Sequence, residues 1–281
     1  MVNFNGELLD QGTAFLDESN RGLRYGDALF DTIRVVNSKI FFWESHYLRL
    51  MASMRIMRLP IPMHFTMEQL EKEILETLKA NTLESKAARV RLTVFRDPGG
   101  YYTPTNTKVS YIIEASALDT PFYTSSQDGY QVELFKDHYV HAGLLSTLKS
   151  SNKLVHILAG IYASENGYQN CLLLNQHKNI IEASNGNIFL VKNNTIKTPP
   201  ITEGCLNGVL RKQLLEIIKK TPEFELEEAP ISPFELQKAD EMFITNVISG
   251  IISVSKYRKK QYDTQVAKTL LGRLNAHVRL L

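Results

Sequence analysis

The sequence predicts a mixed fold, α+β or mixed α/β, in two domains joined by a polar linker. Short runs of β-branched and aromatic residues alternate with amphipathic helical patterns along the chain. The segment 118–129 is polar and rich in turn-forming residues, which is typical of a linker. With 281 residues, the chain can bury a substantial core in each of two modest domains. We therefore expect domains over 1–117 and 130–281.

The first domain is predicted to open with a strand and a helix. β-branched and aromatic residues indicate a strand over 28–36, and Asn37-Ser38 is a plausible turn into Ile40-Phe41-Phe42. A helix follows from about 44 to 58, where Pro60 stops it.

A second helix and two strands complete this domain. Thr66-Met67-Glu68-Gln69 has the capping-box pattern, and an apolar stripe continues behind it. Alternation over 90–96 predicts a strand with Arg91 and Thr93 on its polar face and Arg96 turned outward. The sequence Asp97-Pro98-Gly99-Gly100 breaks that strand, and another strand is expected over 109–115.

The second domain is predicted from the same signals. Helices are expected over roughly 152–166 and from Gly208 to about Lys220. Short strands are expected at 130–136, 170–174, 187–191, 195–198, 243–245 and 251–254.

Composition excludes several classes of function. A formal net charge of +2 gives no reason to expect a nucleic acid or an anionic membrane as partner. No apolar run approaches the ~20 residues that span a bilayer, and the start lacks the pattern of a signal peptide. Cys171 and Cys205 form no CxxC pair, so we expect buried thiols and a reducing cytoplasm. The seven histidines show no metal-ligand spacing, so we expect no metal site.

Three sequence features in the second half of the chain supply chemical groups that can act together. Lys149 supplies an amine, Glu182 closes a predicted strand, and Gly208-Val209-Leu210-Arg211 opens a helix. Pyridoxal 5′-phosphate (PLP) needs an amine for its Schiff base, a carboxylate for its ring nitrogen and a helix N-terminus for its phosphate. The pattern therefore indicates a PLP enzyme.

The order and spacing of these motifs resemble the class IV aminotransferases, which are PLP enzymes of fold type IV. The resemblance extends from about residue 3 to about residue 256, and its other blocks are 21–35, 44–50, 183–189 and 239–246. It implies that family's two-domain fold, with the cofactor cleft between the domains. The family contains branched-chain and D-amino acid aminotransferases and 4-amino-4-deoxychorismate lyases.

The resemblance assigns the cofactor-binding residues. Lys149 is the lysine that attaches PLP and moves a proton at the substrate Cα, and Glu182 faces the ring nitrogen. The family usually has glycine after this glutamate, and the methyl group of Ala183 can narrow the floor under the ring. The phosphate would be bound by Arg49 and by the amides of Gly208, Val209 and Leu210.

The chain departs from the aminotransferase pattern beside the phosphate. Leu210 stands where many members have threonine, and a second hydroxyl is missing near Val247. Either the grip on the phosphate is weaker, or Asn246 compensates.

Arg96 fits the resemblance best as the ligand of the substrate carboxylate, and Arg91 is the alternative. Two further arginines, Arg24 and Arg34, are lower-ranked candidates. Phe30 would form an apolar wall of the pocket or belong to the core. The other loop residues that could reach the site are Tyr101, Tyr102, Tyr139 and His141.

Two reactions compete as the function. The leading hypothesis is a transaminase that moves an amino group between a small amino acid and a 2-keto acid. The alternative is a lyase that converts 4-amino-4-deoxychorismate to pyruvate and 4-aminobenzoate, and the Thr245-Asn246 pair favours it. A scaffold without activity would require Lys149 or Glu182 to be missing. The resemblance also implies a homodimer, to which 28–30 and 40–42 could contribute.

Overall fold

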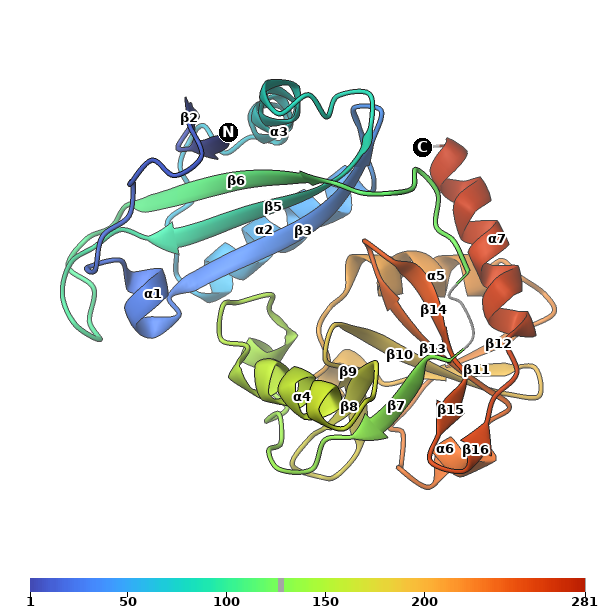
Figure 1. Cartoon of the computed structure of the whole chain (residues 1–281). Helices are drawn as coiled ribbons and strands as arrows, with labels where there is room; N and C mark the ends of the chain where they lie inside the picture. Colours follow the sequence, from blue (N-terminus) through green and yellow to red (C-terminus); the bar gives the residue numbers. More distant parts are fainter. Residues whose placement is uncertain (126–128, 281) are drawn as a thin grey trace. The chain divides into compact units, whose positions relative to one another are not determined.

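The computed structural model describes residues 1–125 and 129–280 and divides the chain into two compact units. Unit 1 comprises Met1–Pro121 and Lys149–Asn152, and unit 2 comprises Phe122–Leu148 and Lys153–Leu281. The predicted mixture of helices and strands is confirmed (Figure 1). The four residues from Lys149 to Asn152 belong to unit 1, although they lie within the range predicted for the C-terminal domain.

Unit 1 is an antiparallel sheet covered by helices. Its strands pair in the order β2-β1-β6-β5-β3-β4, and α2 packs on β3 while α3 packs on β6. The strands are β1 (Val2–Phe4), β2 (Glu7–Leu9), β3 (Ala28–Val36), β4 (Lys39–Ile40), β5 (Ala87–Arg96) and β6 (Val109–Ala117). The helices are α1 (Arg21–Tyr25), α2 (Trp43–Ile56) and α3 (Met67–Ala80).

Local sequence signals explain the elements of unit 1. The Thr66 hydroxyl accepts a hydrogen bond from the Gln69 amide at 3.1 Å and so caps α3. Strands β3 and β5 pair along their whole length, from Ala28 opposite Phe95 to Val36 opposite Ala87. This register places Phe30 opposite Thr93 and Thr32 opposite Arg91.

Lys149 is tied to the start of β3 by backbone hydrogen bonds. The Phe30 amide donates to the Lys149 carbonyl at 2.9 Å, and the Ser151 amide donates to the Ala28 carbonyl at 3.0 Å. The Asn152 side chain donates to the Gly26 carbonyl at 3.3 Å. These bonds explain why the segment belongs to unit 1, although it lies more than 100 residues from β3 in sequence.

Unit 2 is built on a ten-stranded sheet. Its main path is β12-β11-β10-β9-β8-β7-β15-β16, with β13 paired to β10 and to β14. The strands are β7 (Gln131–Leu134), β8 (Asn170–Leu174), β9 (Ile180–Ala183), β10 (Gly186–Lys192), β11 (Thr195–Thr198), β12 (Glu225–Glu228), β13 (Glu241–Asn246), β14 (Gly250–Val254), β15 (Lys256–Tyr257) and β16 (Lys260–Gln261).

The helices of unit 2 pack on this sheet. Helix α4 packs on β8, and α5 and α7 contact each other and β13. The helices are η1 (Leu144–Thr147), α4 (Leu154–Glu165), η2 (Ile201–Glu203), α5 (Val209–Lys219), α6 (Glu235–Lys238) and α7 (Gln265–Leu280). Helix α4 begins two residues later than predicted.

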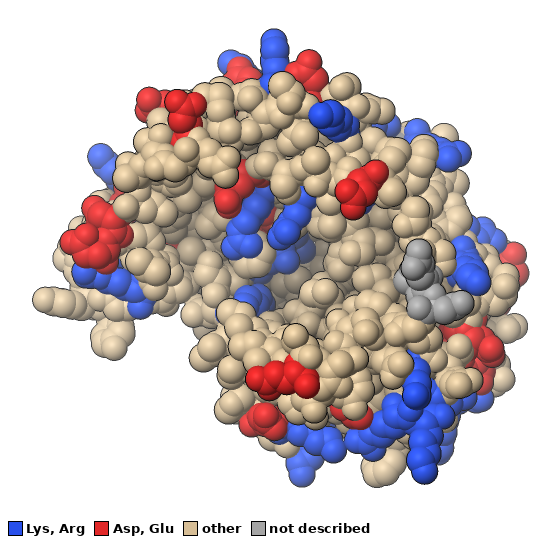
Figure 2. Space-filling view, in the orientation of Figure 1, with Lys and Arg blue, Asp and Glu red and all other residues tan. Residues whose placement is uncertain are grey.

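Two surface properties follow from the described residues. Across 1–125 and 129–280, no helix has the length and apolar character needed to cross a membrane. Figure 2 shows Lys and Arg interspersed with Asp and Glu on the visible face, most of which is uncharged.

Candidate active site

Lys149 and Arg91 both lie against the ring of Phe30 in unit 1. Its Nζ is 4.6 Å from the centre of the Phe30 ring, and the guanidinium carbon of Arg91 is 3.8 Å from the same ring centre. Lys149, Phe30 and Arg91 are all half-buried. Phe30 therefore lies next to the predicted cofactor-binding lysine, and its ring makes cation–π contacts with both Lys149 and Arg91.

An ionic cluster joins Asp31 of β3 to His46 and Arg49 of α2. Arg49 contacts Asp31 through Nη2 at 2.5 Å and Nε at 3.2 Å, and His46 Nδ1 is 2.7 Å from Asp31 Oδ1. Burial raises the pKa of Asp31, but the charges of Arg49 and His46 outweigh it and hold that pKa well below the usual range. Burial lowers the pKa of His46, Asp31 opposes this, and the charges of Arg49 and Lys149 lower it further. Arg49 is therefore oriented by a buried carboxylate.

Arg96 is held by the fold of unit 1 and does not turn outward. Its side chain is buried, and Nε donates to Asp27 Oδ2 at 2.9 Å. Its other two nitrogens donate to the carbonyls of Arg58 and Met57, each at 3.1 Å. The prediction of an outward Arg96 is wrong, because the end of β5 is covered by the segment that follows α2. Its three nitrogens already have structural partners, so Arg91 is the better candidate for a substrate carboxylate.

The remaining candidates for substrate contact are scattered. Arg24 is exposed, and Arg34 is buried and donates to the Thr120 carbonyl. Tyr101 and Tyr102 are exposed. Tyr139 and His141 lie at a small hollow of unit 2, which is lined by Asp137, His138, Tyr139, His141, Leu154, Val155 and Leu158.

Glu182 is a buried carboxylate with a donor on each oxygen. It is 3% exposed and lies on β9, opposite Leu173 of β8 and Asn187 of β10. His156 Nε2 is 2.8 Å from Oε1, and the Leu206 amide donates to Oε2 at 2.8 Å. The sequence did not reveal either partner. His156 is 26 residues from Glu182 in the chain, and a backbone amide has no residue type by which a sequence could indicate it.

Two small residues near Glu182 are structural. The methyl group of Ala183 packs into the core of unit 2 with Leu172 and Ile188, on the face opposite to Glu182. The expectation that it narrows the site is therefore wrong. Cys171 and Cys205 are buried as predicted, and burial together with the Glu182 charge raises the pKa of Cys205 to about 12.

Helix α5 begins three residues after Leu206, whose amide binds Glu182. Gly208 is its N-cap residue, and no side chain caps the helix, while Val209 and Leu210 are buried. A Cβ at Gly208 would lie only 2.0 Å from Asn187 Oδ1, so a side chain here would require Asn187 to move. The buried first turn of α5 therefore presents amides and the positive end of a helix dipole.

Asn246 and Val247 form the turn between β13 and β14. Asn246 Oδ1 accepts from the amides of Ile248 at 3.0 Å and Ser249 at 2.9 Å. The Val247 carbonyl accepts from the Tyr123 hydroxyl at 2.8 Å. The oxygen of Asn246 is thus used within its own turn.

Three polar side chains share one face of the unit 2 sheet. Glu182 pairs with Asn187, which pairs in turn with Thr245 of β13, and directly opposed residues point to the same face. Asn187 donates to the Leu206 carbonyl at 2.9 Å. The Thr245 hydroxyl is buried and has no hydrogen-bond partner among the described residues.

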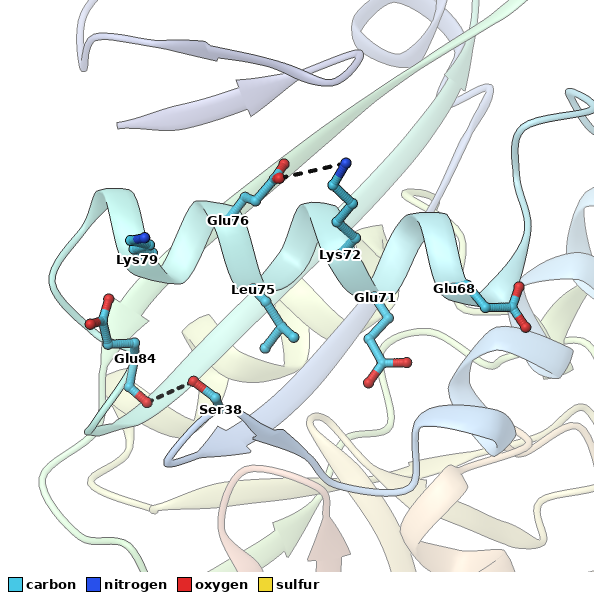
Figure 3. Close-up of a pocket in the computed structure, with 8 residues that line it drawn as sticks. All are labelled: Ser38, Glu68, Glu71, Lys72, Leu75, Glu76, Lys79 and Glu84. Atoms are coloured by element: carbon cyan, nitrogen blue, oxygen red, sulfur yellow. Dashed lines mark hydrogen bonds and ion pairs between the residues drawn. The ribbon is translucent and has the colours of Figure 1, made fainter.

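A groove on unit 1 contains none of the predicted site residues. It lies along α3, where Lys72 pairs with Glu76 at 3.9 Å and Ser38 donates to the Glu84 carbonyl at 2.9 Å (Figure 3). It is lined by Ser38, Glu68, Glu71, Lys72, Leu75, Glu76, Lys79 and Glu84.

Comparison with known proteins decides the family. The model of amino-transferase class IV matches residues 28–257. The chain belongs to the class IV aminotransferase family. This enzyme is 30% identical, over 90% of its own length and 86% of the relative's, to a "Putative branched-chain-amino-acid aminotransferase" of Methanocaldococcus jannaschii.

Further relatives of this class IV enzyme include both predicted reaction types. A D-alanine aminotransferase of Bacillus licheniformis is 26% identical over 90% of this chain and 87% of that protein. The crystal structure of 4-amino-4-deoxychorismate lyase from Pseudomonas aeruginosa matches with a TM-score of 0.83 and 26% identity, covering 98% of both chains. The predicted fold of the family is confirmed.

The residues present fit PLP, which is the cofactor of class IV aminotransferases. A carboxylate has about four lone-pair sites, so Glu182 can accept a third donor after His156 and Leu206. The uncapped, buried first turn of α5 suits a phosphate dianion. In the described part of the chain, no three His, Cys, Asp or Glu side chains are grouped as metal ligands.

Proposed function

We propose that this class IV enzyme is a transaminase that moves an amino group between a small amino acid and a 2-keto acid. PLP supplies the electron sink for the reaction. Lys149 attaches the cofactor and then moves a proton at the substrate Cα, Glu182 supplies negative charge for the ring nitrogen, and the first turn of α5 binds the phosphate. Arg49 adds a positive charge for the phosphate, oriented by Asp31.

The contact that Arg91 and Lys149 each make with the Phe30 ring supports this proposal. The Arg91 guanidinium carbon and the Lys149 Nζ are 3.8 and 4.6 Å from the Phe30 ring centre. We propose that Arg91 binds the substrate carboxylate while the lysine amine serves the substrate Cα. Phe30 would then form an apolar wall for a small side chain. The 30% identity to the archaeal relative supports the same reaction.

Single amino acids test the reaction type. Without a keto acid, a suitable amino acid should convert the bound cofactor to its pyridoxamine form, and absorption spectra follow this directly. Release of 4-aminobenzoate and pyruvate from 4-amino-4-deoxychorismate, with amino acids leaving the spectrum unchanged, would contradict a transaminase.

The lyase is the second candidate, and one observation favours it. Leu210 brings no hydroxyl to the phosphate, and neither does Val247. A weaker hold on the phosphate harms a transaminase more, because its aminated cofactor has no covalent tether. The lyase cofactor stays bonded to enzyme or substrate throughout.

Arg91→Met is expected to raise KM for the amino acid with a smaller effect on kcat. A hydrogen bond to a charged group contributes about 1.5–3 kcal/mol, which corresponds to roughly a 10- to 100-fold change. Steady-state kinetics with the preferred amino acid measures this. Arg89→Met, an exposed residue on the same strand, is the matched control. An unchanged KM in Arg91→Met would exclude Arg91 as the carboxylate ligand.

We further propose that the active enzyme is a homodimer. The segments 28–30 and 40–42, expected at the contact, are mostly buried within unit 1, so that expectation is wrong. Instead, Leu154, Ile157 and Ile161 form an exposed apolar stripe on α4, with exposed fractions of 67%, 57% and 48%.

Ile157→Lys should dissociate this dimer, because it places a charge in an apolar contact. Sedimentation at submicromolar concentration should show a dimeric wild type and a largely monomeric variant. Leu48→Lys, at an exposed leucine of unit 1, should remain dimeric. A monomeric, active wild type would refute the proposal.

A further inference from the structure

His156 reaches Glu182 because of how α4 packs on the sheet. Ala159 and Ala163 are buried against Leu173 and Ile181, and their small side chains let the helix approach the strands closely. His156 lies three residues before Ala159 and seven before Ala163, so it is on the same face of α4. Its imidazole therefore extends from the helix toward β9.

The two donors to Glu182 differ in kind. The Leu206 amide belongs to the backbone and is present whatever the side chain there. His156 contributes the other bond through Nε2, 2.8 Å from Oε1. An ionised carboxylate only accepts hydrogen bonds, so Nε2 must carry a hydrogen. With both oxygens bonded, the carboxylate is held in one orientation.

We propose that His156 is a positioning residue that directs the Glu182 carboxylate toward the ring nitrogen of the cofactor. This inference rests on the role proposed for Glu182. Without His156, Oε1 has lost its hydrogen-bond donor. The carboxylate is then held only by the Leu206 amide at Oε2, and its orientation is no longer fixed. The ring nitrogen then loses part of its ionic partner. Residues that orient a metal ligand contribute about 10- to 100-fold, and we expect an effect near the lower end of that range.

The test uses holoenzyme reconstituted with PLP labelled with ¹⁵N in the ring, because the ¹⁵N chemical shift reports protonation of the ring nitrogen. Glu182→Gln should move this shift away from the protonated value. His156→Ala should move it in the same direction and lower kcat about 10-fold. His156→Gln, which retains an N–H at a similar reach, should restore most of both. His177→Ala, at an exposed histidine of unit 2, should change neither.

The double variant separates positioning from a general structural effect. If His156 acts through Glu182, His156→Ala should add little to the shift or rate of Glu182→Gln. A full additional effect, or a wild-type ¹⁵N shift in His156→Ala, would overturn the inference while leaving the role of Glu182 intact. If Glu182→Gln itself leaves the shift unchanged, the proposed role of Glu182 fails and the inference fails with it.

Discussion

Lys149→Ala is expected to abolish turnover while leaving the fold intact. The variant loses both the covalent attachment of the cofactor and the group that moves the proton at the substrate Cα. A positioned acid–base group contributes up to ~10⁴-fold, so we expect a loss of about that size or more. The side chain is half-buried over Phe30, and its backbone keeps the bonds to β3 in the variant. Steady-state assays and thermal unfolding measure the two effects.

Lys153→Ala is the matched control for this loss. Lys153 lies four residues further on, and its Nζ donates to the Leu148 carbonyl at 3.3 Å. We expect nearly wild-type activity from this variant. Small primary amines added to Lys149→Ala should restore part of the rate, because they can replace the missing amine. Substantial turnover by Lys149→Ala without added amine would rule out the assigned role.

Glu182→Gln is expected to retain the cofactor but to slow the chemical step by ~10²–10³-fold, as is typical when a partner of a developing charge is lost. The substitution is nearly isosteric, and its oxygen can still accept from the Leu206 amide. It cannot supply the negative charge that keeps the ring nitrogen protonated. Single-turnover kinetics isolates the proton abstraction from product release.

Glu203→Gln is the matched control, because it removes the charge of another carboxylate in unit 2. Glu203 Oε2 accepts from the side chains of Asn175 at 2.7 Å and Asn179 at 2.9 Å. We expect its loss of charge to leave the chemical step unchanged. An almost unchanged rate in Glu182→Gln would show that another group serves the ring nitrogen.

Local patterns in the sequence were sufficient for most elements of the fold. The alternation around Arg91 and the capping box at Thr66 predict β5 and α3, because both depend on neighbours within a few residues. Helix α7 was not predicted, although its buried residues recur at helical spacing: Ala267, Leu270, Leu271, Leu274 and Val278.

Side-chain partners distant in sequence could not be predicted. Arg96 ends a strand where an outward side chain is plausible, but Asp27 and two carbonyls near residue 58 enclose it. The apolar residues 40–42 are equally compatible with a core or an interface, and only their burial decides between them. His156 looks like any helical histidine until α4 is packed on the sheet beside Glu182.

The attachment of PLP to Lys149 is the central claim, and borohydride reduction tests it most directly. Reduction makes the covalent linkage between cofactor and lysine permanent, and peptide mass spectrometry then locates the label. Our account predicts a phosphopyridoxyl group on the peptide that contains Lys149, and none on that peptide in Lys149→Ala. A label on another lysine, or no label in cofactor-loaded protein, would contradict it.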